Sequence, residues 1–347
     1  MTLMTDSPDL QSRLVRYRDL RPCTTAFIDT KSPGSDKKEN FTIIGPGVAE
    51  NPAQYVHITE KHGFNIGGAR QPPKCKNSVH SHETAEVFMI HSGTWRFVWG
   101  EHGDAGSIVL KAGDVISLPA KMFRGFENIG DDTGFMFAIL GGDDPGRVLW
   151  AGHVLERAKR YGLILLEGGR LIDTSAGEKV PDGAAIEQTP TPEELARIIV
   201  PSLEEMRTCI LTREAMVTSS AYGGLTCEGV KEYPVIGLPN ASDGVGSSPM
   251  AWRHGFTLRT VEIAPGAETV LHSRNCHEVW IMYQGELEMS QGPGGAPAIS
   301  ISRGDTFTVP IGMPRSWRNP GKEVAIAWVV RGNDDPGPVD LYKASSV

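Results

Sequence analysis

Residues 78–93 read SVHSHETAEVFMIHSG, and residues 270–285 read VLHSRNCHEVWIMYQG. Each stretch carries a histidine, a glutamate six residues later and a glycine seven residues after the glutamate: His80, Glu86 and Gly93 in the first, and His272, Glu278 and Gly285 in the second. A pattern that recurs at matching positions indicates an internal duplication, which constrains the architecture before any single element is assigned.

The duplication extends well beyond these stretches. An offset of 192 residues relates His62-Gly63-Phe64 to His254-Gly255-Phe256, and an offset of 191 relates Gly113-Asp114 to Gly304-Asp305. The tetrapeptide DDPG at 143–146 returns at 334–337, again at 191. A one-residue deletion in the second copy explains the change of offset, so we expect two copies of one fold.

Each copy is expected to be all-β. The runs SIVLKAGDVISLP (107–119) and AISISRGDTFTVP (298–310) are β-prone segments broken at Gly-Asp turns. The apolar runs GFMFAIL (134–140) and EVAIAWVV (323–330) are typical of buried strands. Many short strands with glycine-rich turns predict a sandwich or a jelly-roll barrel.

The predicted domains are an N-terminal helical or extended arm (1–40), a first β domain (41–146), a mixed connector with helices (147–240) and a second β domain (241–347). Ser7-Pro8 could start a short N-terminal helix with Leu10, Leu14 and Tyr17 on one face. Within the connector, HVLERAKRYG is a second predicted helix, and Thr191 to Glu194 fits a capping box of a third that Pro201 would end.

The composition excludes several classes of function. A net charge of −8 with no basic cluster argues against nucleic acid and anionic membranes as partners, and favours a small molecule. The five cysteines include no C-x-x-C pair, which argues against a disulfide framework and a zinc finger. The sequence has no apolar run of the ~18 residues that a membrane span needs and no secretory signal at its start, so we expect a cytoplasmic protein.

With the repeat in place, the residues resemble the cupin superfamily, whose motifs have the forms G-x5-H-x-H-x3-E-x6-G and G-x5-P-x-G-x2-H-x3-N. The first copy matches at His80, His82, Glu86, Gly93, Gly113, Pro119 and Asn128, and the second at His272, Glu278, Gly285, Gly304, Pro310, Gly312 and Asn319. The resemblance covers roughly residues 55–145 and 250–335 and implies a bicupin, with two jelly-roll barrels. Bicupins of similar size include gentisate-type and quercetin-type dioxygenases, and oligomers are expected by analogy.

In this superfamily the two histidines, the glutamate and the histidine of the second motif bind one divalent metal. His80, His82 and Glu86 are therefore the predicted metal ligands, with Fe(II) as the first expectation and Mn, Ni or Zn as alternatives. Arg124 replaces the fourth ligand. Two accounts of Arg124 stay open: it contacts a substrate carboxylate beside a three-ligand metal, or it pairs with Glu86 and no metal binds.

The second copy departs further from the motif. Arg274 and Arg315 stand at two histidine positions, so only His272 and Glu278 remain of the ligand set. We expect no metal there. The pocket would be a structural salt-bridge cluster, or an anion site that uses bidentate arginine contacts.

The leading functional prediction is a metal-dependent oxygenase that acts on an anionic small organic acid, with aromatic acids as one class, in the N-terminal copy, and Arg124 orients the substrate. The alternatives are an isomerase, epimerase or lyase that uses the metal as a Lewis acid on a sugar or small acid, and a ligand-binding bicupin without metal.

Overall fold

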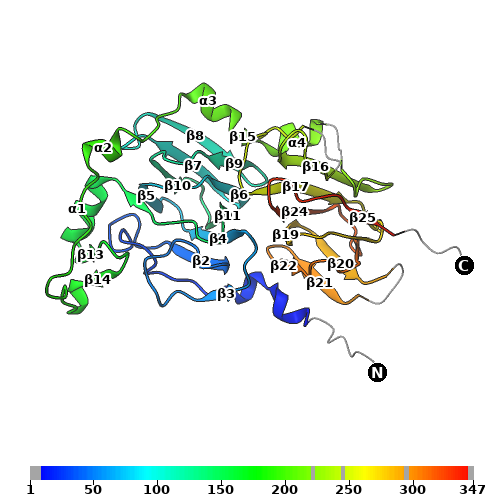
Figure 1. Ribbon diagram of the computed structural model, residues 1–347, viewed down its shortest axis with the longest axis horizontal. Coiled ribbons are helices and arrows are strands. Elements are labelled where there is room, and N and C mark those ends of the chain that lie inside the picture. The colour runs from blue at the N-terminus through cyan, green and yellow to red at the C-terminus, as the bar shows by residue number, and fades with distance from the viewer. Residues whose placement is uncertain (1–8, 220–222, 244–246, 293–296, 343–347) are drawn as a thin grey trace, which may run out of the picture. The chain divides into compact units, whose positions relative to one another are not determined.

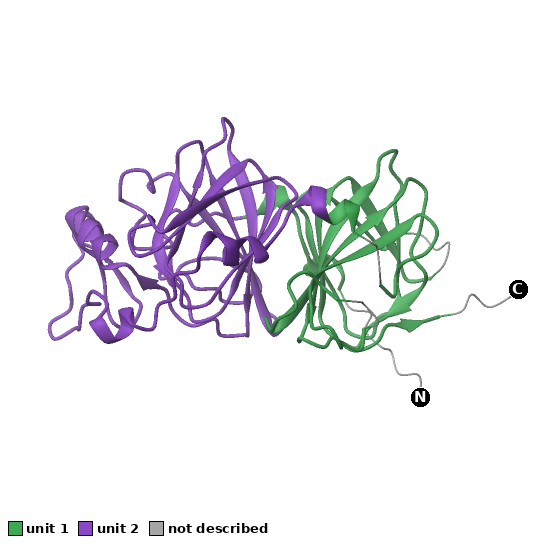
Figure 2. Cartoon of the chain, turned by 90° about the horizontal axis from the view of Figure 1, so that it is seen from above, with its two compact units in different colours: residues 1–20, 216–347 green, residues 21–215 purple. Residues whose placement is uncertain are grey.

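The computed structural model describes residues 9–219, 223–243, 247–292 and 297–342. The chain divides into two compact units (Figure 2). Residues 21–215 form the unit that we call the N-terminal barrel, and residues 216–347 together with residues 1–20 form the C-terminal barrel.

The N-terminal barrel has two main sheets (Figure 1). In the described residues, one sheet has the strand order β15-β9-β6-β11-β4-β2-β3 and the other β12-β5-β10-β7-β8, and a separate hairpin joins β13 to β14. The strands are β2 Glu39–Ile44, β3 Val56–Ile58, β4 Phe64–Gln71, β5 Lys76–Ser81, β6 Glu86–Ser92, β7 Thr94–Trp99, β8 Gly106–Lys111, β9 Val115–Leu118, β10 Arg124–Asn128, β11 Gly134–Gly141, β12 Leu149–Trp150, β13 Leu163–Leu165, β14 Leu171–Asp173 and β15 Ile210–Leu211.

The C-terminal barrel repeats this plan. Over its described part, the larger sheet has the order β1-β22-β19-β24-β17-β16, a smaller one has β21-β20-β23, and β18 pairs with β25. The strands are β1 Leu14–Val15, β16 Val230–Ile236, β17 Phe256–Ile263, β18 His272–Ser273, β19 Glu278–Gln284, β20 Glu286–Ser290, β21 Ile299–Ser302, β22 Thr306–Val309, β23 Ser316–Arg318, β24 Ala325–Gly332 and β25 Asp340–Leu341. The predicted all-β architecture of two barrels is confirmed.

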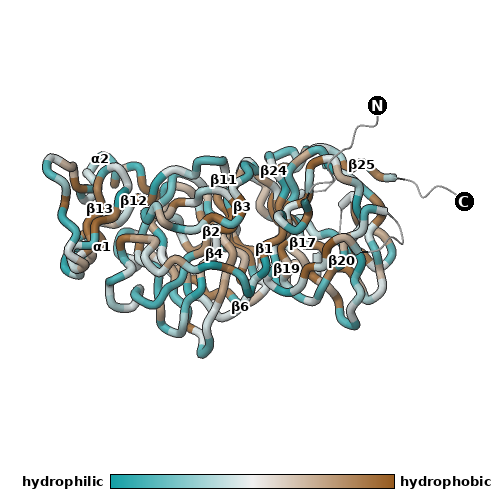
Figure 3. The backbone as a smooth tube through the Cα atoms, turned by 90° about the horizontal axis from the view of Figure 1, so that it is seen from below, coloured by the Kyte–Doolittle hydropathy of each residue, from teal (hydrophilic) through white to brown (hydrophobic). Residues whose placement is uncertain are grey.

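Hydropathy explains where the strands form and how they pack. The apolar run of β11 lies between β4 and β6 and is buried along nearly its whole length, whereas the edge strand β8 alternates between more and less exposed residues. Hydrophobic stretches follow strands such as β2 and β19, and hydrophilic stretches are frequent in the loops (Figure 3). In the N-terminal barrel, Trp95, Phe97 and Phe126 belong to one buried cluster that fills the interior beside β7 and β10.

The Gly-Asp turns that punctuate the sequence have the same structure in both barrels. Gly113 has a φ of +93°, and the carboxylate of Asp114 accepts a hydrogen bond from the backbone of Lys111 at 2.8 Å. Gly304 has a φ of +86°, and Asp305 accepts from the backbone of Ser302 at 3.0 Å. Glycine occupies these positions because a Cβ atom disfavours positive φ.

The predicted N-terminal helix is wrong. The 3-10 turns η1 (Gln11–Arg13) and η2 (Tyr17–Asp19) flank β1, which pairs with β22. An ion pair of 2.7 Å between Arg16 and Asp305 holds this segment in place. Pairing with a sheet edge therefore outweighs the helical pattern of the apolar residues. The predicted cap at Ser7-Pro8 lies outside the described residues.

The predicted connector, residues 147–240, divides between the two units. It contains the helices α1 (Gly152–Arg160), α2 (Pro192–Leu195), α3 (Leu203–Thr208) and α4 (Arg213–Thr218) and the 3-10 turn η3 (Thr174–Ala176). The predicted helix in HVLERAKRYG is confirmed as α1, and the capping box of Thr191 and Glu194 is present at α2. α2 already ends at Leu195, before Pro201. Among the described helices, none has the length and apolar character to cross a membrane.

Candidate metal centre in the N-terminal barrel

The three predicted ligands meet where the chain crosses from one sheet to the other. His80 lies on β5, Glu86 is the first residue of β6, and His82 belongs to the loop between these strands. One ligand atom from each of the three side chains lies within 4.8 Å of the other two, and all three residues are buried. In the described part of the chain this is the one cluster of histidine, cysteine or carboxylate side chains with this geometry.

Both histidines are held in the form that binds metals. Nδ1 of His80 lies 2.8 Å from the carbonyl oxygen of Ser78, which can only accept, so the proton is on Nδ1 and the lone pair is on Nε2. Burial, and then the charge of Arg124, lowers the pKa of His80 to about 3 and holds the pKa of His82 well below its usual range. Neutral imidazole is a metal ligand, whereas imidazolium is not.

Glu86 supplies a buried carboxylate with spare acceptor capacity. Its Oε2 lies 3.8 Å from Nε2 of His82 and 3.5 Å from Nε of Arg124, and it has no hydrogen-bond partner within the described residues. Burial raises the pKa of Glu86, and the charge of Arg124 only partly offsets this. A buried carboxylate is costly without a cation, and two neutral imidazoles beside it complete a donor set that suits a divalent metal. The residues present therefore fit the metal.

Arg124 contacts this cluster but does not line the cavity beside it. It is the first residue of β10, directly opposite His80 in the strand register, and it is completely buried. Its Nη1 donates to the carbonyl oxygen of Met122 at 3.0 Å, and its Nε lies 3.5 Å from Oε2 of Glu86. This is not the bidentate contact of ~2.8 Å that would neutralise Glu86 and leave no use for a metal.

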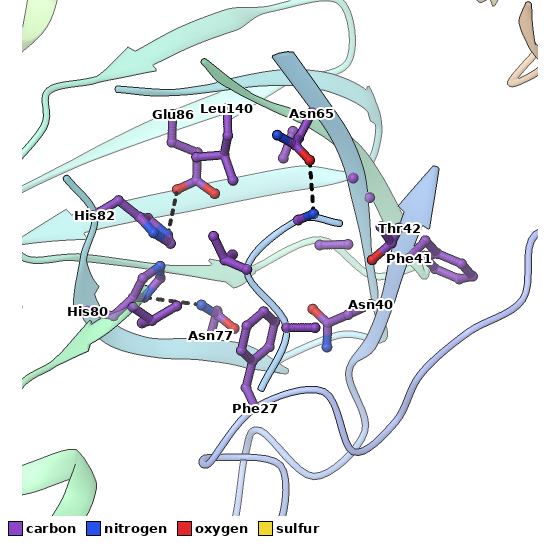
Figure 4. A pocket seen from close by; sticks show the side chains of 18 of the residues that line it. Phe27, Asn40, Phe41, Thr42, Asn65, Asn77, His80, His82, Glu86 and Leu140 are labelled. Atoms are coloured by element: carbon purple, nitrogen blue, oxygen red, sulfur yellow. Dashed lines mark hydrogen bonds and ion pairs between the residues drawn. The ribbon is translucent and has the colours of Figure 1, made fainter. Parts of the chain in front are cut away.

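A cavity of about 80 Å³ opens in front of the three ligands. Its apolar wall includes Phe27, Phe41, Phe88, Phe126, Leu140 and Trp150, and its polar wall, apart from the ligands, comprises Asn40, Thr42, Gln54, Asn65 and Asn77. Figure 4 shows His80, His82 and Glu86 on one side of this space and Asn40, Phe41 and Thr42 on the other. Among the described residues that line it there is no lysine or arginine, so Arg124 is not part of the wall.

Sequence reasoning missed most of this wall. Phe27, Asn40, Gln54 and Trp150 lie outside both motifs, on segments without a recognisable pattern. Trp150 reaches the site because β12 pairs with β5 and places it opposite His80 in the register, with ring centroids 5.3 Å apart. A contact between strands so far apart in sequence leaves no local signal.

The equivalent place in the C-terminal barrel holds an ion-pair network. Glu278 pairs with Nη2 of Arg315, with Nε of Arg331 at 3.0 Å and with Nε of Arg274 at 3.4 Å. Burial would raise the pKa of Glu278, but these three guanidinium groups together hold it well below its usual range. Burial lowers the pKa of His272 to about 3, so its ring is neutral.

The network continues through residues that the sequence analysis did not single out. Nη1 of Arg331 lies 2.7 Å from Glu232, and Nη2 of Arg259 lies 2.8 Å from Asp243. All four side chains are buried. The structure thus places the predicted Arg274, Glu278 and Arg315 within a larger salt-bridge cluster. The neutral ring of His272 lies beside this cluster and forms no ion pair in it.

The strand registers show what this network replaces. Glu86 faces Leu140 across β6 and β11, and Glu278 faces Arg331 across β19 and β24, so Leu140 and Arg331 are equivalent. By the same comparison Gly67 corresponds to Arg259, and Asn40 to Glu232. Three positions that line the cavity of the N-terminal barrel are therefore charged side chains in the other barrel.

Comparison with known proteins agrees with this architecture. Residues 69–140 match a family model described as a cupin domain, and residues 247–346 match one described as cupin. No curated protein sequence matches the chain.

Solved structures with the same fold include oxalate decarboxylases and a vicilin. The oxalate decarboxylase of Lactobacillus farciminis, in a formate complex, is 15% identical with a TM-score of 0.54, covering 93% of this chain and 87% of that one. Hazelnut (Corylus avellana) vicilin is 12% identical with a TM-score of 0.51, covering 93% and 86%. The oxalate decarboxylase of Bacillus subtilis is 15% identical with a TM-score of 0.53, covering 93% and 76%, and it has Mn(II) centres. At these identities the likeness shows the fold alone.

Proposed function

Because the chain belongs to the cupin superfamily, as a bicupin with two barrels in one polypeptide, we propose that its N-terminal barrel is a divalent-metal-dependent enzyme. His80, His82 and Glu86 hold the metal. The observation that carries this proposal is the buried cluster of two neutral imidazoles and one carboxylate at the wall of a cavity.

Three protein ligands leave positions on the metal open for a substrate and for oxygen. We therefore propose oxygenation of a small organic acid with Fe(II) as the leading reaction. When bound, the metal supplies a site where the substrate and oxygen are brought together. The protein contributes the orientation of its ligands and an apolar wall that limits water in the cavity.

The acidic end of the substrate is proposed to bind at the metal, because no cationic side chain lies among the described residues of the cavity wall. Arg124 then acts as a positioning residue. Its charge favours the ionised form of Glu86, and its contact with Oε2 restrains the position of that carboxylate.

A second candidate is a lyase that uses Mn(II), and the structural likeness to oxalate decarboxylases favours it. The two candidates differ in the metal that supports turnover and in whether oxygen is consumed in proportion to product.

The first test is elemental analysis of protein purified without an affinity tag, beside the variants His80→Ala and His272→Ala. The two changes remove equivalent histidines from the two barrels. We expect about one metal per chain, lost in His80→Ala and kept in His272→Ala, followed by oxygen-electrode measurements on the loaded protein with a panel of small acids. No metal after reconstitution with Fe(II), Mn(II), Ni(II) and Zn(II) would instead leave a metal-free ligand-binding bicupin.

A further inference from the structure

Apart from atoms of the three metal ligands, two polar atoms in the cavity wall have no hydrogen-bond partner within the described residues: Nδ2 of Asn40 and Oε1 of Gln54. Asn40 is 9% exposed. A buried polar group without a partner destabilises the protein, so such groups in a cavity wall mark the place where a ligand supplies the missing bond.

The other amides of the wall are already used. Asn65 accepts from the backbone of Gly47 at 2.9 Å and donates to the carbonyl oxygen of Gly142 at 2.7 Å. Asn77 accepts from Nζ of Lys38 at 2.6 Å. The side chains of Asn65 and Asn77 thus form hydrogen bonds within the protein, whereas Asn40 and Gln54 each keep one polar atom for a ligand.

Asn40 and Gln54 belong to one region of the wall. Asn40 and Thr42 are two residues apart on β2, so they share a face of the sheet. Nε2 of Gln54 donates to the hydroxyl of Thr42, which leaves its Oε1 as an acceptor. Figure 4 shows Asn40 and Thr42 across the cavity from His80, His82 and Glu86. A ligand bound at the metal would therefore point its far end toward one donor and one acceptor.

The same region holds no counter-ion for a negative charge among the described residues. Lys38, which contacts Asn77 in the wall, is already paired with Asp29. A carboxylate at the far end of the substrate would lose its hydration without gaining a counter-ion. An uncharged group with one acceptor and one donor would form the missing hydrogen bonds of both Asn40 and Gln54.

We propose that the cavity selects substrates with an acidic, metal-binding end and an uncharged far end that carries an acceptor and a donor, such as a carboxamide or a hydroxyl beside a carbonyl, and that it rejects dicarboxylates. The inference rests on the proposed function. The volume of about 80 Å³ holds roughly six water-sized groups, so the substrate is a small acid.

The sharpest probes are oxamate and oxalate, which have the same size and shape but differ in an amide against a carboxylate. Both are titrated by calorimetry into Mn(II)-loaded protein, and the ratio of their dissociation constants is compared with the same ratio for free Mn(II), which removes the intrinsic preference of the metal. We expect a shift of at least tenfold toward oxamate. The near-isosteric variants Asn40→Leu and Gln54→Met should each weaken oxamate about fivefold or more and leave oxalate unchanged, while His272→Ala in the other barrel should change neither.

A ratio equal to that of free Mn(II), or a shift that both variants preserve, overturns the inference and leaves the metal site standing. If no metal binds, the proposed function fails, and the selectivity is then measured on the metal-free protein with propionamide and propionate by ligand-observed NMR. A preference for propionamide that Asn40→Leu abolishes supports the uncharged far end, and equal binding refutes it.

Discussion

Glu50 gives the N-terminal barrel a stability that should fall as the pH rises. Its carboxyl is buried, and it accepts hydrogen bonds from the backbone of Ile28 at 2.7 Å and from Nε1 of Trp150 at 2.5 Å. Burial raises the pKa of Glu50 to about 8 from an ordinary value of 4.5, against the opposing effect of these two donors. The charged groups facing it are Asp29 and Lys38, which are paired with each other.

The sign and size follow from proton linkage. Between pH 4.5 and about 8 the folded protein keeps the proton of Glu50 and the unfolded chain releases it, so each pH unit removes about 1.4 kcal/mol from the free energy of unfolding. The contribution is complete below pH 4.5, and it is lost as the pH rises through the folded pKa of about 8. Over the whole window the limit is about 5 kcal/mol.

The assay is urea unfolding of the wild type and Glu50→Gln, followed by tryptophan fluorescence at pH 5, 6, 7 and 8 with a chelator present, so that metal linkage does not contribute. Glutamine cannot titrate and loses one of the two accepted bonds, which costs roughly 1 kcal/mol at every pH. We expect the wild-type free energy of unfolding to fall relative to the variant by about 1.4 kcal/mol per pH unit. A difference that stays constant from pH 5 to 8 would refute the reasoning.

Three further outcomes are expected. Glu278→Gln should lower the free energy of unfolding of the C-terminal barrel by about 3–5 kcal/mol in urea, because it leaves buried guanidinium groups uncompensated. Glu86→Gln in metal-free protein should lower it less, since only one guanidinium approaches that carboxylate. Equal losses would contradict this. Arg124→His should raise the affinity for a divalent metal roughly tenfold or more, because it removes a neighbouring charge and adds an imidazole. The affinity is measured by competition with a metal-sensitive dye, and weaker binding would contradict the metal site at His80, His82 and Glu86. Val15→Ala should lower the stability of the C-terminal barrel by about 1–2 kcal/mol, because this buried residue lies in the strand that covers β22; an unchanged urea midpoint would show that the pairing is not stabilising.

The barrels and the ligand cluster were accessible from the sequence because both are encoded locally and twice. The Gly-Asp turns and the apolar runs of β11 and β24 appear at fixed offsets in the two copies, which indicates a duplicated fold. His80, His82 and Glu86 were found through spacing, although the structure shows that one strand ends at Ser81, before His82, and the next begins at Glu86. Their shared direction comes from the crossing between two sheets and not from alternation along one strand.

The rest depended on contacts that spacing does not contain. The N-terminal segment has apolar residues at helical intervals, but its pairing with β22 comes from nearly 300 residues away. The charged network around Glu278 did leave a signal in the repeat itself: Arg331 stands where the first copy has Leu140, and Arg259 where it has Gly67. Charged residues at positions that are apolar or small in the sister copy indicate that the interior of one barrel has been filled.

The C-terminal barrel is assembled from two separate pieces of chain, residues 1–20 and residues 216–347. The N-terminal barrel uses one continuous piece and has all of its strands once residue 215 has been synthesised. Since domains fold as units while the ribosome extends the chain, the N-terminal barrel can be complete while β1 still has no partner. β1 is thus synthesised before the other described strands, and it stays unpaired until β22 is synthesised near the end of the chain.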